Sequence, residues 1–284
     1  MLKQRVITAI VLLAILLPAL FWPSPAPFAA ITLILIAAGA WEWGRLNGMS
    51  APVSALPAAV CLAMCAASWQ QGLLVRPLPL LWTFAGALWV LLGAALIRGG
   101  VPAWPGIPRA VRLVGGVIAL WLAWLAVAQA RTTGINFLLS ILVLVWVADI
   151  FAYFAGRTFG MKFTNRKLAP AISPGKSWEG VWGGMIGVLV LAFAWAWADR
   201  AFGAPEPSLY SRLADKGWWL LMLAALFLSA MSVVGDLVES LIKRSAGVKD
   251  SSHLLPGHGG VLDRVDALLP TLPLALMLAG YASR

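Results

Sequence analysis

Long apolar runs recur along this chain of 284 residues, and they constrain its fold more than any other feature. Sixty-one per cent of the residues are apolar and 11% are charged, which exceeds the apolar content that a water-soluble domain of this length could bury. An apolar helix of about 20 residues crosses the roughly 30 Å hydrocarbon core of a bilayer. The sequence therefore predicts an all-α polytopic membrane protein.

About nine segments have the length and apolarity of membrane-spanning helices. They are residues 6–22, 28–44, 53–70, 79–97, 111–130, 135–154, 179–198, 218–239 and 266–282. Lys3 and Arg5 precede the first segment, as basic residues precede a secretion signal, but the segment extends to Trp22 and further spans follow. We interpret it as a retained anchor.

Lysine and arginine are unevenly distributed between the two sides that these spans define. With a cytoplasmic N-terminus, fifteen of the 21 basic residues fall on the cytoplasmic side and six fall outside. This asymmetry predicts a cytoplasmic N-terminus and an outside C-terminus. It also accounts for the net charge of +10 without a nucleic-acid partner, since the chain has no soluble module with a basic, aromatic patch.

The two halves of the chain differ in polar content. Spans within residues 1–130 hold almost nothing ionisable apart from Glu42, which predicts a scaffold where oligomer contacts could form. Cys61 and Cys65 lie one turn apart in an apolar span, where packing explains them better than a metal or redox role. The cytoplasmic ends within residues 131–284 are rich in charge, which predicts the catalytic region there.

The first polar segment lies at the inner end of the sixth expected helix. At 3.6 residues per turn, Asp149, Tyr153, Gly156 and Gly160 share one face. We expect this face to point into the bundle, with Asp149 and Tyr153 near the substrate, because acids inside membranes are costly to keep. The alternative is that Asp149 only pairs with a cytoplasmic Arg or Lys.

The second polar segment is the loop from Arg157 to Glu179. Its Gly175-Lys176-Ser177 sequence is similar to the end of a Walker A motif, but Pro170 stands where that motif requires glycine. Basic side chains and free backbone N–H groups at the start of the next helix could still bind phosphates. The candidate substrate-binding residues are Lys167, Ser173, Lys176, Ser177 and Glu179. The alternative is a solvated loop attracted to lipid headgroups.

The third polar segment combines a helical stripe with a glycine-rich turn. Polar residues recur every three or four positions along the eighth helix, at Ser229, Ser232, Asp236, Ser240 and Lys243. After the turn, Asp263 and Asp266 begin the ninth helix on the same side of the bilayer. Carboxylates that converge among many cations suit Mg²⁺ bound to phosphates.

These residues also carry a resemblance. Ser240-x-x-Lys243-Arg244, Lys249-Asp250 and Pro256-Gly257-His258-Gly259-Gly260-x-x-Asp263-Arg264-x-Asp266 resemble the signature of the phosphatidate cytidylyltransferases, also called CDP-diacylglycerol synthases. The segments around Asp149 and Lys176 are similar to other blocks of that family. The resemblance covers about the last 140 residues.

The resemblance implies a reaction in which CTP and phosphatidic acid give CDP-diacylglycerol and pyrophosphate. It implies Mg²⁺, with K⁺ as a second cation, held by Asp236 and Asp263. It also implies a homodimer in a bacterial cytoplasmic (inner) membrane, with membrane lipids around it and the active site facing the cytoplasm. The expected catalytic residues are Asp236, Asp263, Lys243, Arg244, Lys249, Asp250, His258, Arg264 and Asp266, with Ser240, Gly259 and Gly260 contacting substrate.

Two alternatives remain open. A CTP-dependent enzyme that acts on another lipid phosphate would need the same arrangement of residues. A transporter of an anionic solute is a more remote alternative, since transport favours polar groups on both sides of the midplane and related repeats. The ionisable groups here gather on one side.

Overall fold

The computed structural model of the protein describes residues 2–282, and almost all of its regular structure is helical. The long helices are α1 (Leu2–Phe21), α2 (Ala26–Leu46), α3 (Ala55–Gln70), α4 (Pro79–Ala103), α5 (Arg109–Thr133), α6 (Ile135–Phe159), α7 (Trp178–Ala201), α9 (Trp218–Ser245) and α11 (Leu268–Ala282). The short elements are a 3-10 turn (Trp104–Gly106), helices α8 (Leu209–Lys216) and α10 (Leu262–Val265), and strands β1 (Lys167–Ala169) and β2 (Ser173–Ser177).

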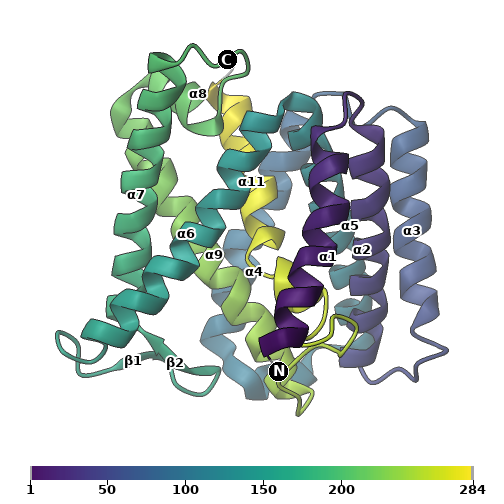
Figure 1. The fold of residues 1–284 in the computed structure, drawn as a ribbon. Helices are drawn as coiled ribbons and strands as arrows, with labels where there is room; N and C mark the ends of the chain where they lie inside the picture. The colour runs from purple at the N-terminus through teal and green to yellow at the C-terminus, as the bar shows by residue number, and fades with distance from the viewer. Residues whose placement is uncertain (1, 283–284) are drawn as a thin grey trace.

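Eight helices within residues 2–282 are long and apolar enough to cross a membrane, which confirms an all-α polytopic membrane protein. The eighth of these spans runs from Leu262 to Ala282 and includes both α10 and α11. The expected third span is the 16-residue helix α3, which is shorter than these eight spans. At 1.5 Å per residue it is about 24 Å long, and it packs beside α2 and α5. Successive helices run in alternating directions, so that α1 begins and α11 ends at opposite ends of the bundle (Figure 1).

Glycines bring α6 and α7 into close contact. A Cβ at Gly183 would lie 2.2 Å from the Cβ of Ala155, and one at Gly187 would lie 2.4 Å from the ring of Phe151. Small residues allow helix backbones to approach in this way. The close packing continues to the end of α6, where Gly156 lies against Gly180 and the Ser177 hydroxyl at the start of α7.

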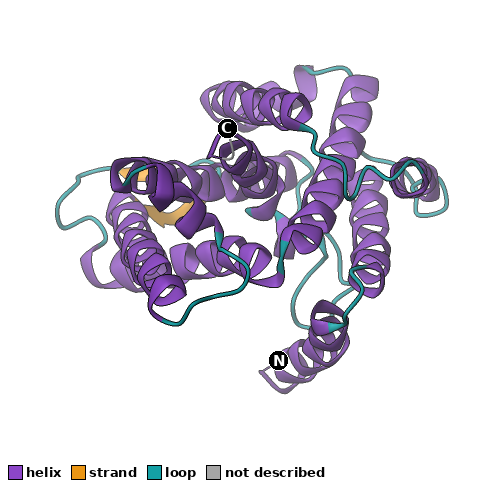
Figure 2. Cartoon of the chain, turned by 90° about the horizontal axis from the view of Figure 1, so that it is seen from above, coloured by secondary structure: helices purple, strands orange, loops and turns teal. Residues whose placement is uncertain are grey.

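The segment from Arg157 to Glu179, expected as a loop, contains a short antiparallel hairpin of β1 and β2 in which Lys167 pairs with Ser177. The Lys167 ammonium donates to the Pro174 carbonyl at 2.8 Å. Seen from above, the two strands lie on one side of the molecule (Figure 2). The hairpin lies at the same end of the bundle as the start of α1 (Figure 1).

The expected scaffold and catalytic segments share one core. Helix α4 packs against α9 and α11, and α5 packs against α6 and α11. The side chains of Leu125, Leu144 and Leu221, which come from both halves of the chain, are fully buried. Contacts between the halves therefore decide where the polar groups of the second half lie.

Candidate functional site

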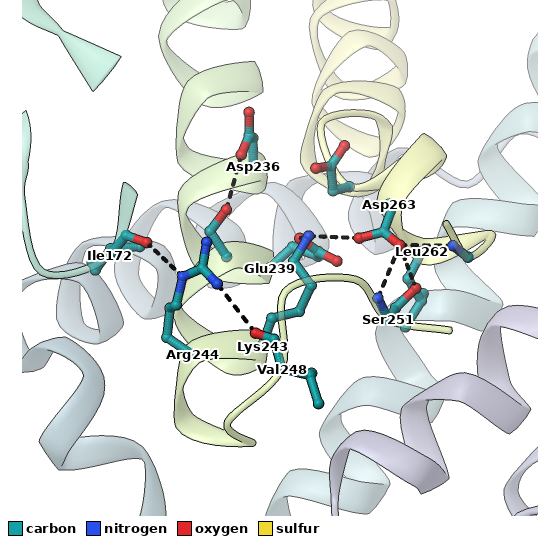
Figure 3. A network of polar contacts seen from close by, with 12 residues as sticks. Ile172, Asp236, Glu239, Lys243, Arg244, Val248, Ser251, Leu262 and Asp263 are labelled. Carbon is teal, nitrogen blue, oxygen red and sulfur yellow. Dashed lines mark hydrogen bonds and ion pairs between the residues drawn. The ribbon is translucent and has the colours of Figure 1, made fainter. Parts of the chain in front are cut away.

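The charged residues singled out in the sequence gather at the end of the bundle that carries the hairpin. Helix α9 provides the central group, and Figure 3 shows Asp236, Glu239, Lys243 and Arg244 along it, with Asp263 opposite. The neighbours come from β2, the end of α6, and the segment from residue 249 to α10.

Asp236 is joined to the hairpin by an ion pair. The Lys176 ammonium on β2 lies 2.6 Å from one Asp236 oxygen, and the Ser240 hydroxyl donates to the other at 3.2 Å. The side chains of Lys176 and Asp236 are 26% and 31% exposed. This ion pair is therefore accessible to a ligand that approaches from the end of the bundle.

Asp263 belongs to a second, more buried ion-pair cluster. The Lys243 ammonium lies 2.5 Å from Asp263 Oδ1 and 2.6 Å from Glu239 Oε2. Asp263 Oδ2 accepts hydrogen bonds from the Ser251 N–H and hydroxyl, both at 2.9 Å, and from the Gly260 N–H at 2.7 Å (Figure 3). Both Asp263 oxygens are thus engaged, and its side chain is only 5% exposed.

Three carboxylates from separate parts of the chain lie within electrostatic range of one another. Asp149 on α6 and Asp266 after α10 each interact with Asp236, and they also interact with each other. The close approach has a simple cause at Gly235, where a Cβ would lie 2.5 Å from the Asp266 carbonyl oxygen. Asp266 therefore interacts with Asp236 and also with Glu239, and Asp263 interacts with Glu239 and pairs with Lys243.

Glu42 on α2 binds the backbone at residues 261–262, a role that was not predicted from the sequence. Its side chain is fully buried, and its two oxygens accept from the Val261 and Leu262 N–H groups at 2.8 Å each. They also accept from the hydroxyls of Ser251, at 3.1 Å, and Ser252, at 2.6 Å. An acid alone in an apolar helix was the available signal, because such a group must find polar partners.

The glycine-rich turn at residues 256–260 is contacted by side chains of α1 and α2. On α1, the Arg5 side chain donates to the Gly257 carbonyl at 2.9 Å and the Thr8 hydroxyl donates to the Pro256 carbonyl at 2.8 Å. Gly257 and Gly259 have φ values of 76° and 82°, a left-handed conformation that favours glycine. A Cβ at Gly260 would lie 2.4 Å from a Glu42 oxygen.

Other expected site residues have local partners. Arg244 donates to the Ile172 carbonyl at 3.4 Å and the Val248 carbonyl at 3.2 Å, which links the hairpin segment to the segment after α9. The hydroxyl of Ser177 caps α7 by accepting from the Gly180 N–H. Tyr153 is 57% exposed, and its hydroxyl accepts from Arg157 at 2.9 Å.

The remaining candidates differ in how far they are available to a ligand. Lys249, Asp250 and Arg264 are exposed, and Ser173 is half-buried on β2. Nδ1 of His258 is buried and has no hydrogen-bond partner among the described residues. Glu179 is engaged elsewhere, because its carboxylate accepts from the 163–164 backbone.

The donor chemistry of this region fits a hard divalent cation only in part. Within residues 2–282, no three His, Cys, Asp or Glu side chains form a group that could hold a metal ion by themselves. Mg²⁺ commonly uses one or two carboxylates together with substrate phosphates and water, so a full protein cage is not required. Asp236 and Asp263 each hold a lysine ammonium at 2.5–2.6 Å, a cationic group placed where a metal ion would bind.

Comparison with known proteins identifies the family. A model of the Cytidylyltransferase family matches residues 3–282. The chain is 39% identical to the phosphatidate cytidylyltransferase of Pseudomonas aeruginosa, over all of both chains, and 38% identical to that of Haemophilus influenzae, over 96% of each. The protein of the same name from Bacillus subtilis is 41% identical over about half of each chain. The chain therefore belongs to the cytidylyltransferase family.

Proposed function

We propose that this protein transfers CMP from CTP to phosphatidic acid and so produces CDP-diacylglycerol and pyrophosphate. The observation that carries the proposal is the convergence of the 240–266 signature with Lys176 and Asp149 at one end of a membrane-spanning bundle. Full-length similarity to two proteins named phosphatidate cytidylyltransferase supports the same reaction.

The reaction requires charge control and positioning more than proton transfer. An oxygen of the lipid phosphate forms a bond to the α-phosphorus of CTP, and the bond from that phosphorus to the β-phosphate bridging oxygen breaks. The attacking oxygen is already ionised at neutral pH, so a strong general base is not needed. Catalysis then depends on holding two anions in line and stabilising the pyrophosphate that leaves.

The accessible cations are suited to the phosphates. Lys249 and Arg264 are exposed, and neither forms an ion pair within the described part of the chain. We also propose that His258 in the nearby glycine-rich turn contacts a phosphate, although its Nδ1 is buried. Lys176 can exchange Asp236 for a phosphate, because both groups are partly exposed.

We propose Mg²⁺ as the cofactor, held by Asp236 and Asp263, with K⁺ as a second cation. Bound there, Mg²⁺ would supply charge neutralisation between the two anionic substrates and on the departing pyrophosphate. Asp236 is the more accessible ligand, whereas Asp263 must exchange Lys243 or a backbone donor for the ion. Asp149 and Asp266 add the negative charge that attracts cations to Asp236.

We further propose that the site faces the cytoplasm of a bacterial inner membrane and that the protein is a homodimer. A site at the inner interface lets a soluble nucleotide meet a lipid headgroup without either crossing the bilayer. The excess of Lys and Arg on that side supports this orientation.

The test is incorporation of labelled CTP into lipid by the purified full-length protein. We expect incorporation with phosphatidic acid and Mg²⁺, little incorporation after Mg²⁺ is chelated, and little with ATP, GTP or UTP. Faster incorporation into an isoprenoid ether lipid phosphate than into phosphatidic acid would reassign the substrate. No incorporation into any lipid phosphate would refute the proposed activity.

A further inference from the structure

The outward face of α7 adjoins an open pocket at the hairpin end of the bundle. Trp182, Ile186, Val190 and Trp197 follow one another after four, four and seven residues, and each is between 44% and 64% exposed. On a membrane-spanning helix this spacing forms a stripe that contacts acyl chains. At the hairpin end, the stripe reaches a cavity of about 400 Å³ lined by Thr164, Asn165, Arg166, Trp178 and Trp182.

The polar wall of this cavity has a defined conformation. Glu179, at the start of α7, accepts from the Phe163 and Thr164 N–H groups at 3.1 and 2.7 Å, and from the Thr164 hydroxyl at 2.8 Å. Its carboxylate is therefore used to hold residues 163–164 against the helix that carries both tryptophans. A wall that is already ordered loses little entropy when a ligand binds.

The same wall carries a net positive charge. Residues 157–167 contain Arg157, Lys162, Arg166 and Lys167 and no acidic residue, against the single carboxylate of Glu179 that contacts them. Among the described residues, the Arg166 guanidinium and the Asn165 amide have no side-chain partner, and both line the cavity. An arginine fork beside interfacial tryptophans matches a phosphate at the depth of the lipid headgroups.

We propose that this cavity binds an anionic glycerophospholipid, with its headgroup phosphate at Arg166 and an acyl chain along Trp182 and Ile186. The site lies on the lipid-facing side of α7, and neither Lys176 nor Asp236 lines it. A second copy of the chain is a poorer occupant, because a twofold contact would bring like-charged Arg166 segments together. The proposal rests on membrane embedding and not on cytidylyl transfer.

Lipid binding can be measured without catalysis. The full-length protein in detergent, without CTP, is titrated with phosphatidylglycerol, phosphatidic acid or phosphatidylcholine of the same acyl chains, and bound lipid is counted by native mass spectrometry. Loss of a charge-assisted contact should weaken phosphatidylglycerol binding about tenfold in Arg166→Gln. Arg98→Gln is the matched control, since Arg98 is an exposed arginine near the end of α4.

Each outcome decides the proposal. Weaker binding of both anionic lipids in Arg166→Gln, with Arg98→Gln unchanged, supports a general anionic-lipid site. Weakening of phosphatidic acid alone would overturn the general anionic-lipid site and indicate a docking site for substrate. The proposal is overturned if phosphatidylcholine binds as tightly as phosphatidylglycerol, or if Arg166→Gln binds all lipids normally. It is also overturned if the only change in that variant is loss of dimers.

Discussion

Replacing Glu42 by Gln tests whether a buried acid of the N-terminal half positions the catalytic segment. One Glu42 oxygen accepts from the Val261 N–H and the Ser252 hydroxyl, and the other accepts from the Leu262 N–H and the Ser251 hydroxyl. A glutamine places an NH₂ group at one of these positions. The serine hydroxyls can rotate, but a backbone N–H cannot, so one buried donor loses its acceptor.

The magnitude follows from these contacts. An unsatisfied buried donor costs about 1–3 kcal/mol, and the remaining bonds weaken because their acceptor is no longer charged. We therefore expect a total cost of about 2–4 kcal/mol in the ordered arrangement of residues 251–262. Since about 1.4 kcal/mol corresponds to a factor of ten, turnover should fall by about 30-fold or more.

The assay is pyrophosphate release from CTP with phosphatidic acid, together with thermal unfolding and limited proteolysis in detergent. A positioning role predicts a large loss in kcat, faster cleavage within residues 251–262, and a modest change in the unfolding temperature. Glu206→Gln is the control, at an exposed glutamate. Its carboxylate also accepts a backbone N–H, that of Ile135 at 2.8 Å, but at the opposite end of the bundle.

The reasoning would be refuted if Glu42→Gln kept a wild-type kcat, or if it lost activity only in proportion to the fraction of protein unfolded. Equal losses in Glu42→Gln and Glu206→Gln would also contradict it, because they would indicate general destabilisation. A Glu42→Asp variant adds a rescue test. Partial recovery of kcat by this shorter acid would show that the carboxylate charge, and not the volume, is required.

Three further predictions concern the site itself. Asp263→Asn should insert normally but lose Mg²⁺-dependent pyrophosphate release by about 100-fold or more, since it removes a charged ligand; comparable turnover would refute the metal role. Lys176→Met should raise the KM for CTP or phosphatidic acid about tenfold, whereas an unchanged KM for both would leave Lys176 only as the partner of Asp236. Gly260→Ala should reduce activity because its Cβ would lie 2.1 Å from the Ser251 hydroxyl, while Gly175→Ala, which has open space, should be nearly neutral in the same assay.

Much of the fold could be read from the sequence because a bilayer restricts the choices. Backbone groups in hydrocarbon must be hydrogen-bonded within their own helix, so each long apolar run predicts a helix almost independently of the rest. The eight membrane-length helices therefore agree with expectation, and only the 53–70 span is shorter than the others. The hairpin at residues 167–177 was not expected, since its strands are short and lie in a polar segment.

The signature residues could be recognised from the local sequence, but most of their contact partners could not. Lys243 and Asp263 are close in the chain, and both appear in one motif. Apart from Ser240 on the same helix, the partners of Asp236 are Lys176, 60 residues away, and the carboxylates of Asp149 and Asp266. No local pattern reports such contacts, because they depend on which helix faces pack together.

The amino-acid sequence alone determined that this protein is a helical membrane protein with a charged block at one end, since apolar length and charge are local properties. The tertiary structure alone decided that Glu42, more than 200 residues away in the chain, holds Val261 and Leu262. It also decided that Asp149 and Asp266 lie within electrostatic range of Asp236. Both depend on close helix packing, at Gly235 and along α2, which brings distant backbone and carboxylate groups within bonding range.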